Sequence, residues 1–233
     1  MTTEIELHPI QAQILRVLLF KPLARFSELN ITEVGTDQFS FHIKQLLAEN
    51  MISKSHEGLY ELTRKGKEFA NRLDTDKLNV EKQAKIGVSV VAIKKQNGIR
   101  KYLIQQRLKQ PYYGFYGLIT GKVRLGETAV ETALRELKEE TGLSGKVIMC
   151  GIRHKMDYAQ DNNLLEDKFF FAFRAENLTG KLIEKFEGGR NMWLSKEEIF
   201  KLPDLFPDME VAIKAANSRG YKFSERKYTV NKF

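Results

Sequence analysis

The stretch of sequence that decides the fold is Gly121–Leu143, which reads GKVRLGETAVETALRELKEETGL. Its apolar residues Val130, Leu134 and Leu137 recur at the spacing of one helix face, so the stretch predicts a helix over about residues 128–141. A glycine directly after this segment is a common helix terminator. The stretch is therefore predicted to be a glycine-containing loop followed by an amphipathic helix.

Three carboxylates fall together on this helix, away from its apolar face. Glu136, Glu139 and Glu140 stand at positions i, i+3 and i+4, which places them on one patch about one turn long. Like charges at this spacing destabilise an ordinary helix by about 0.2–0.5 kcal/mol per pair. Divalent cations would remove that repulsion, and hard oxygen ligands suit Mg²⁺ or Mn²⁺. A solvated acidic helix is the alternative interpretation of the short acidic segment taken alone.

The residues around the carboxylates favour a site over a solvated face. Arg135 lies beside the acidic patch and is able to reach Glu131 or the loop carboxylate of Glu127, which would hold loop and helix in a fixed relation. Gly121 and Gly126 allow the backbone a tight approach before the helix begins.

This pattern resembles the Nudix box, in which glycine, glutamate, Arg-Glu, Glu-Glu and glycine recur at fixed spacings, and each specified position of that box agrees here. The resemblance covers about residues 86–215. It implies a Nudix α/β/α sandwich with a mixed sheet, and a hydrolase that uses Mg²⁺ or Mn²⁺ to split a nucleoside diphosphate linked to another moiety. It further implies metal ligation by Glu136, Glu139 and Glu140, with Arg135 as a fourth residue of the catalytic set.

The loop departs from the family pattern at two points. Ile119-Thr120-Gly121 stands where the family usually has Pro-Gly-Gly, so the Gly121 carbonyl, which the resemblance places in the metal shell, has unusual neighbours. Arg124 stands where many members carry an acidic residue, which makes the mouth of the site more basic.

Residues outside the box complete the predicted site. Glu187 is predicted to be the further metal ligand, with Asp161, Glu166 and Asp167 as alternatives. Substrate contacts are predicted from cations that suit phosphates and from an aromatic cluster, Tyr112 to Tyr116, in which one ring would stack on a base while at least two pack in the core. The predicted substrate-binding residues are Arg107, Phe115, Tyr116, Lys122 and Arg124.

The first 75 residues predict a separate α+β module. The spacing indicates a helix after Pro9, a short helix near residues 25–29, a helix from Thr36 to about residue 50, a hairpin over residues 51–62 and a last helix over 64–73. This order resembles the winged helix-turn-helix of bacterial and archaeal transcription regulators. The resemblance implies a recognition helix and wing that would bind duplex DNA through Gln38, Ser40, His42, Lys44 and Lys54.

The net charge of +8 is not spread evenly over the 233 residues. Residues 1–76 hold 9 Lys+Arg and 11 Asp+Glu, whereas residues 77–233 hold 29 and 19. Because duplex affinity comes largely from cations that neutralise phosphates, the module that resembles a DNA binder lacks the expected charge. A pyrophosphate substrate explains the basic second part equally well.

The composition bounds the remaining possibilities. With 42% apolar residues and one cysteine, Cys150, the chain suits a folded cytoplasmic protein without disulfides, and it contains no apolar run long enough to span a membrane. The expected organisation is a winged helix over 1–75, a linker over 76–85, a Nudix domain over 86–218 and a C-terminal extension over 219–233. Strands are expected over 87–94, 101–107, 146–154 and 168–175, with later helices over 195–202 and 208–218.

Two functions remain open at this stage. The first is a hydrolase acting on ADP-ribose, a nucleotide sugar or a nucleoside triphosphate, with an accessory winged helix. The second is a transcription regulator that uses the Nudix domain as a nucleotide sensor. A homodimer is compatible with both, because both domain types often dimerise.

Overall fold

The computed structural model describes residues 7–31, 34–74 and 82–233. The chain forms two compact units, Met1–Lys82 and Gln83–Phe233, each with its own core. Residues 76–81 of the expected linker lie outside the described residues. No helix among the described residues is long and apolar enough to cross a membrane.

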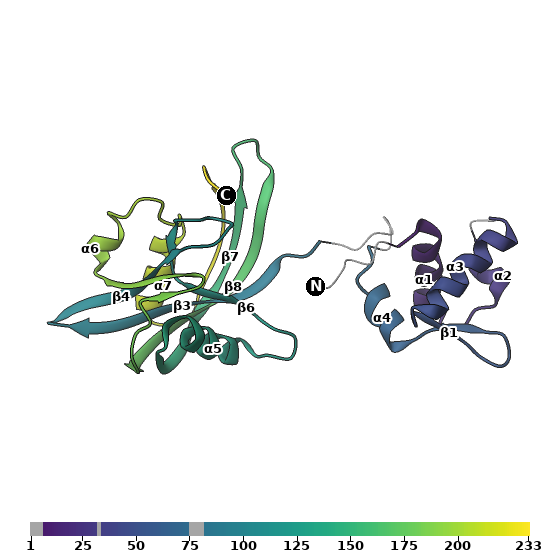
Figure 1. Ribbon diagram of the computed structural model, residues 1–233, viewed down its shortest axis with the longest axis horizontal. Helices are drawn as coiled ribbons and strands as arrows, with labels where there is room; N and C mark the ends of the chain where they lie inside the picture. The colour runs from purple at the N-terminus through teal and green to yellow at the C-terminus, as the bar shows by residue number, and fades with distance from the viewer. Residues whose placement is uncertain (1–6, 32–33, 75–81) are drawn as a thin grey trace. The chain divides into compact units, whose positions relative to one another are not determined.

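The described residues of the first unit form four helices and a two-stranded antiparallel sheet (Figure 1). The His8 side chain caps the first helix and Pro9 occupies its first turn, where a missing N–H costs nothing. The Thr63 hydroxyl accepts a hydrogen bond from the Gly66 amide and begins the last helix. The elements are α1 Pro9–Phe20, α2 Phe26–Leu29, α3 Thr36–Ala48, β1 Ile52–Lys54, β2 Tyr60–Leu62 and α4 Arg64–Ala70.

The core of this unit is formed by the inner faces of α1 and α3. Ile14, Leu15 and Phe39 are fully buried, and they pack with residues of the hairpin. Gly66 sits so close to the hairpin that a Cβ at this position would lie 1.8 Å from the Met51 carbonyl oxygen. The hairpin and α4 are therefore fixed against the helices as one body.

The second unit is built on a nine-stranded mixed sheet. Within the described residues the strand order is β11-β7-β8-β3-β4-β10-β9, while β5 pairs with β4 and β6 pairs with β3. The β3–β8 and β11–β7 pairs are parallel and the others antiparallel. The elements are β3 Lys85–Gln96, β4 Ile99–Arg107, β5 Tyr116–Gly117, β6 Ile119–Lys122, α5 Ala129–Thr141, β7 Ser144–Tyr158, β8 Leu164–Thr179, β9 Lys185–Phe186, β10 Gly189–Leu194, α6 Lys196–Ile199, α7 Met209–Asn217 and β11 Lys222–Thr229.

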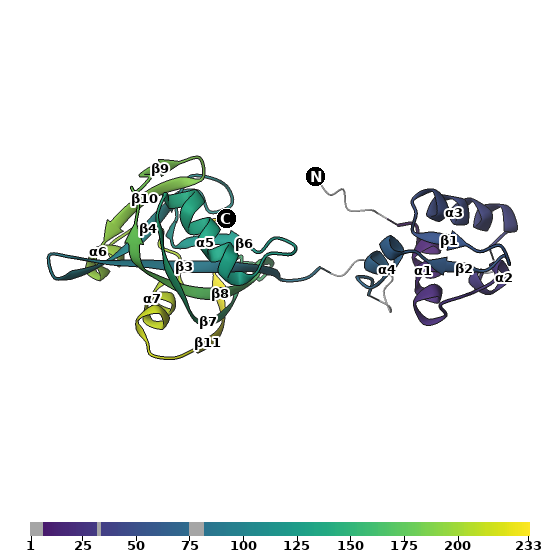
Figure 2. The ribbon, with the colours of Figure 1, turned by 90° about the horizontal axis from the view of Figure 1, so that it is seen from below.

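Helices cover both faces of this sheet because β3 alternates between two cores. Val88 and Val90 face α5 and pack with Leu137, whereas Val91 faces the opposite side and packs with Ile213 of α7. Figure 2 shows α5 and α7 on opposite sides of β3. The predicted mixed α+β fold is thus confirmed for the second unit.

The main difference from the sequence prediction lies at the C-terminal end. Residues 219–233 were expected to pack on the surface as an extension, but Lys222–Thr229 form β11, which pairs with β7 over eight consecutive residues. A Cβ on Gly151 would lie 1.8 Å from the Lys222 carbonyl oxygen, so this glycine permits the close approach of β11. Beyond the strand, Val230 is buried against Tyr112, which anchors the C-terminal residues to the domain.

Candidate active site

The loop and α5 are joined by reciprocal caps. The Glu131 carboxylate accepts hydrogen bonds from the Thr128 amide at 2.8 Å and hydroxyl at 2.7 Å, while the Thr128 hydroxyl accepts one from the Glu131 amide at 3.2 Å. Gly142, at φ 72°, ends the helix in the left-handed conformation. Because the Glu131 carboxylate is bound to the N-cap residue Thr128, Arg135 pairs with Glu127, the second of the two partners that the sequence analysis considered.

Arg135 is the centre of an ion-pair network. Its guanidinium contacts both oxygens of Glu127, from Nε at 2.7 Å and from Nη2 at 2.9 Å, in the bidentate geometry that suits a carboxylate. Its Nη1 lies against Glu136 and 3.2 Å from Glu139, and Nη2 donates to the Lys122 carbonyl at 3.2 Å. Hydrogen bonding to Arg135 lowers the pKa of Glu127 to about 2, so the network is charged at neutral pH.

Gly121 makes room for Glu136. A Cβ at position 121 would lie 2.0 Å from the Glu136 carboxyl carbon, closer than non-bonded atoms approach. Gly121 pairs with Val88 of β3, so its backbone is fixed in the sheet and is unable to shift away from α5. The Glu136 carboxylate therefore lies directly against the backbone of β6.

Glu140 differs from the other two carboxylates in its environment. Burial is the main cause that raises its pKa to about 7; repulsion from Glu136 adds to this, whereas a hydrogen bond from Gln105 and the charges of Lys109 and Arg107 oppose it. Because a buried carboxyl of this kind is stabilised when a cation lies beside it, its chemistry suits a place next to bound metal.

The carboxylates do not yet form a closed coordination cage. No group of three His, Cys, Asp or Glu side chains within the described ranges is spaced to hold one ion. Arg135 Nη1 bridges Glu136 and Glu139, and Glu140 accepts a hydrogen bond from Gln105. The donor set nevertheless fits a divalent cation, because it offers hard carboxylate oxygens on one helix face, and Glu140 is half-buried without an ion pair among the described residues.

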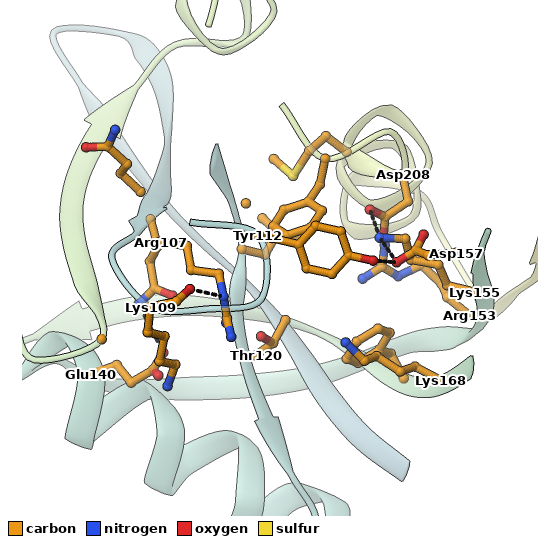
Figure 3. A pocket seen from close by; sticks show the side chains of 18 of the residues that line it. Arg107, Lys109, Tyr112, Thr120, Glu140, Arg153, Lys155, Asp157, Lys168 and Asp208 are labelled. Atoms are coloured by element: carbon orange, nitrogen blue, oxygen red, sulfur yellow. Dashed lines mark hydrogen bonds and ion pairs between the residues drawn. The ribbon is translucent and has the colours of Figure 1, made fainter. Parts of the chain in front are cut away.

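A pocket of about 110 Å³ opens beside Glu140 (Figure 3). The Tyr112 side chain spans it and donates a hydrogen bond from its hydroxyl to Asp157 at 2.9 Å. Glu140 lies at one end with Lys109, while Lys168 and the group around Asp157 lie at the other. The charged side chains that line the pocket are Arg107, Lys109, Glu140, Arg153, Lys155, Asp157, Lys168 and Asp208.

The family is shown by the sequence pattern that surrounds these residues. The pattern of the NUDIX domain family matches residues 84–216, which is more than half of the chain. The chain belongs to the Nudix family. The predicted Nudix domain is thereby confirmed, and the helix α5 with its preceding loop is its Nudix box.

Curated relatives match shorter segments. An ADP-ribose pyrophosphatase from Methanocaldococcus jannaschii is 47% identical over 47 residues, which cover 20% of this chain and 28% of the relative. A Nudix hydrolase from Bacillus subtilis, YvcI, is 26% identical over 98 residues, which cover 41% of this chain and 61% of the relative. The chain thus spans less than two thirds of the length of each of these relatives.

Solved structures share the fold of the second unit. The MutT protein from Bacillus halodurans superimposes with a TM-score of 0.53 at 22% identity, over 64% of this chain and 93% of that structure. The Nudix domain of Shewanella oneidensis NrtR, solved in complex with ADP ribose, superimposes with a TM-score of 0.52 at 18% identity, over 66% and 97%.

The predicted phosphate-contacting cations have different roles in the Nudix domain. Arg107 lines the pocket, but its guanidinium donates to the carbonyls of Lys109, Gln110 and Pro111 and so holds the loop after β4. The Arg124 guanidinium is exposed and lies 3.7 Å from Glu139, at the mouth of the site. Lys122 has an exposed side chain, and its carbonyl accepts from Arg135.

Two aromatic residues predicted to bind substrate are in the core instead. Phe115 packs against Tyr112 and Phe206 at centroid distances of 5.4 and 5.1 Å, and Tyr116 joins the cluster that packs on α7. The predicted stacking of Phe115 on a base is therefore corrected, because apolar neighbours cover its ring, whereas Tyr116 stays half-buried. Phe170 and Phe186, which the sequence did not single out, line the pocket.

The four candidates for the metal ligand outside the Nudix box have different surroundings. Glu187 is exposed in the turn between β9 and β10, next to Gly188, which lines the pocket. Glu166 instead pairs with Lys85 at 2.8 Å and Lys168 at 3.3 Å. The other two alternatives are engaged elsewhere, Asp167 with His154 and Asp161 with Asn163.

Sequence reasoning missed the charged group at the far end of the pocket. Arg153, Lys155 and Asp157 alternate along β7 and so point to the same face of the sheet. All three are buried, which is unusual for charged residues. The alternation of charges within an otherwise apolar strand is the signal that would have found them.

In the first unit, four of the five predicted DNA contacts are accessible. Gln38, Lys44 and Lys54 are exposed and Ser40 is half-buried. His42 is 5% exposed and stacks on His8 with ring centroids 4.2 Å apart, and burial lowers its pKa. The prediction that His42 faces DNA is corrected, because it shares the buried face of α3 with Phe39, Ile43 and Leu46.

Proposed function

We propose that this protein is a metal-dependent Nudix hydrolase that cleaves the pyrophosphate of a nucleoside diphosphate linked to another moiety. The observation that carries the proposal is the Arg135 network, which holds Glu136 and Glu139 on the helix whose Glu140 lines a pocket together with Arg107 and Lys109. ADP-ribose is the first substrate to examine, because the relative from Methanocaldococcus jannaschii is an ADP-ribose pyrophosphatase. Nucleotide sugars and nucleoside triphosphates carry the same reacting group.

Glu136, Glu139 and Glu140 would hold Mg²⁺ or Mn²⁺, with the Gly121 carbonyl and Glu187 as further ligands. Bound divalent ions neutralise phosphate charge and lower the pKa of a bound water, which makes hydroxide available at neutral pH. Arg135 fixes the positions of the Glu136 and Glu139 carboxylates before substrate binds.

The pocket residues position the substrate. The charges of Lys109 and Arg107 lower the pKa of Glu140 against the effect of burial. The same charges favour an anionic diphosphate at this end of the pocket. Tyr112 extends toward the opposite end, where its hydroxyl donates a hydrogen bond to Asp157. Arg124 at the mouth would attract the anionic substrate from solution.

A nucleotide panel with Mg²⁺ or Mn²⁺ tests the proposal. We expect release of a nucleoside monophosphate from at least one member, and a decrease in kcat of about 100-fold or more in Glu139→Gln, because one ligand charge is lost. Glu184→Gln, which removes an exposed carboxylate outside the box, is expected to leave the rate unchanged. Absence of turnover on the whole panel would refute the assignment.

For the first unit we propose a winged helix-turn-helix that serves as an accessory domain, in a cytoplasmic protein that forms a homodimer. The support is the element order of three helices, hairpin and helix, together with the accessible side chains of Gln38, Lys44 and Lys54. These side chains favour a second function, in which nucleotide binding to the Nudix domain regulates binding of duplex DNA.

Mobility-shift titrations test this second function. We expect labelled upstream DNA to bind more tightly than random duplex, with the affinity reduced in Lys44→Ala and altered by the preferred nucleotide. Equal affinity for both DNAs at physiological salt would leave the winged helix as a protein-contact module only.

A further inference from the structure

The far end of the pocket is built from cations that the proposed hydrolysis does not use. Arg153 and Lys155 come from β7 and Lys168 from β8, and all three line the pocket away from Glu140 (Figure 3). The Lys155 ammonium also lies 4.6 Å from the centroid of Phe206 and 6.0 Å from that of Tyr112. These groups form a separate wall, which we call the β7–β8 wall.

The β7–β8 wall carries more positive charge than its carboxylates neutralise. Asp208 pairs with Arg153, and Asp157 lies 3.1 Å from the Lys155 ammonium, so these four charges balance. Lys168 has Glu166 as its ion-pair partner at 3.3 Å, and that carboxylate is already bound by Lys85 at 2.8 Å. The positive charge of Lys168 is therefore only partly compensated.

The Lys168 ammonium is also destabilised by its surroundings. Burial lowers its pKa most, and repulsion from Lys155 and Lys85 adds to this against the attraction of Glu166. A second anion placed between Lys168 and Lys155 would relieve this repulsion. A negatively charged group bound at the wall would therefore stabilise the Lys168 ammonium.

Two polar atoms of the wall lack a partner among the residues that the structure describes. Arg153 is 4% exposed and its Nε has no acceptor, while Asp157 is 1% exposed and its Oδ1 has no donor. Buried polar groups are nearly always hydrogen-bonded, so this donor and this acceptor would each be stabilised by a polar group brought to the wall. An anionic oxygen next to a hydroxyl group meets this requirement.

We infer that the β7–β8 wall binds a second anionic group of the substrate, one that lies apart from the scissile diphosphate. This inference rests on the proposed function and narrows its substrate class to nucleoside diphosphate conjugates that carry a further phosphate monoester or carboxylate. Lys168 and Arg153 donate to the anionic oxygens, and Asp157 accepts from a hydroxyl on the same moiety. The diphosphate itself lies at the Glu140 end.

Matched substrate pairs test the inference. NADPH and NADH, or coenzyme A and dephospho-coenzyme A, differ by one phosphate, whereas UDP-glucuronate and UDP-glucose differ by one carboxylate. We expect the charged member of one kind of pair to have a kcat/KM about tenfold higher, as expected for one charge-assisted hydrogen bond. The kind of pair that shows the preference identifies the anionic group.

The variant Lys168→Met separates this role from a structural one. It removes the ammonium, while Glu166 keeps Lys85 as a partner, so the fold is retained. We expect the preference to disappear through a higher KM for the charged member, with kcat unchanged for the uncharged member. Lys146→Met, an exposed lysine of β7 outside the pocket, controls for the general loss of one positive charge and keeps the preference.

The outcomes distinguish the two proposals. Hydrolysis of both members at equal kcat/KM, or equal losses on both in Lys168→Met, overturns the inference and leaves the hydrolase intact. If no nucleotide is turned over, the hydrolase proposal fails, and calorimetric binding of the same pairs to the unmodified protein still decides the inference. Tighter binding of the charged member then supports anion binding at the β7–β8 wall, and equal binding of the two members overturns the inference.

Discussion

At the scale of single residues, Arg135 organises the Nudix box. It joins the loop carboxylate Glu127, the helix carboxylates Glu136 and Glu139, and the Lys122 carbonyl. A lysine has one point charge and no planar fork, so it is unable to make these contacts together. The position of the glutamates therefore depends on an arginine that need not touch substrate.

We expect Arg135→Lys to lower kcat/KM by about 10–100-fold, the usual cost of losing a group that orients metal ligands. The melting temperature should fall by a few degrees, because the bidentate pair with Glu127 is lost. Steady-state kinetics and thermal unfolding measure the two effects. Arg64→Lys, which keeps an exposed charge pair with Glu68, is the matched control and should change neither.

Gly121→Ala is expected to lower activity by about 100-fold, because the new methyl group would displace the Glu136 carboxylate from its place against β6. Gly126→Ala, in the same loop, meets no atom within 4 Å and adds only the strain of a positive φ of 85°. A larger activity loss in the second variant than in the first would contradict this explanation.

The box residues were predictable because their spacing on one helix decides which of them share a face. The sequence did not predict the positions of Phe115, Tyr116 and His42. The environment of each of these side chains depends on packing between elements that are distant in sequence. An aromatic or histidine side chain suits a buried cluster as well as a binding surface, so residue type alone does not decide between them.

At the scale of elements, β7 joins the pocket to the C-terminal strand. Its residue His154 lies between Glu225 of β11 at 2.7 Å and Asp167 of β8 at 2.8 Å, and it stacks on Phe169. Burial lowers the pKa of His154, but the hydrogen bonds to Glu225 and Asp167 outweigh that effect and raise it overall. The protonated imidazole thus stabilises the three-strand edge.

A group with a raised pKa contributes stability below its unfolded-state value, near 6.5, and loses it as the pH rises through the folded value. We therefore expect the melting temperature of the protein to exceed that of His154→Gln by about 2–4 °C at pH 6, which corresponds to roughly 1 kcal/mol. The difference should shrink as the pH is raised toward 9. A difference that grows with pH would show that the imidazole is neutral in the folded state.

The helix α5 was predictable from the sequence, and so were the strands that carry β-branched residues. The strand β11 was not predictable from the sequence. Lys222–Thr229 has exposed side chains on both faces, and the segment is held in the sheet by backbone pairing with β7. Strands of this kind lack the apolar alternation that identifies a half-buried strand.

At the scale of the whole molecule, the two units have separate cores. The positive charge belongs mainly to the second part, where the pocket is lined by Arg107, Lys109, Arg153, Lys155 and Lys168. The side chains of this pocket therefore supply part of the positive charge, as the proposed anionic substrate requires.

A chain of residues 83–233 is expected to fold and to keep kcat/KM within about twofold of the full protein, because compact units with their own cores fold alone. Circular dichroism and kinetics on the best substrate check this expectation. A loss of activity in a folded fragment would show that the first unit contributes to catalysis.

The place of β11 also ties the pocket to a segment far from the box in the sequence. Lys222–Thr229 complete the edge of β7, and Val230 and Phe233 pack against Tyr112, which lines the pocket. Deletion of residues 222–233 would remove these contacts but leave the box helix and its glutamates in place. A chain shortened in this way is therefore expected to keep a folded box while Tyr112 loses part of its support at the pocket.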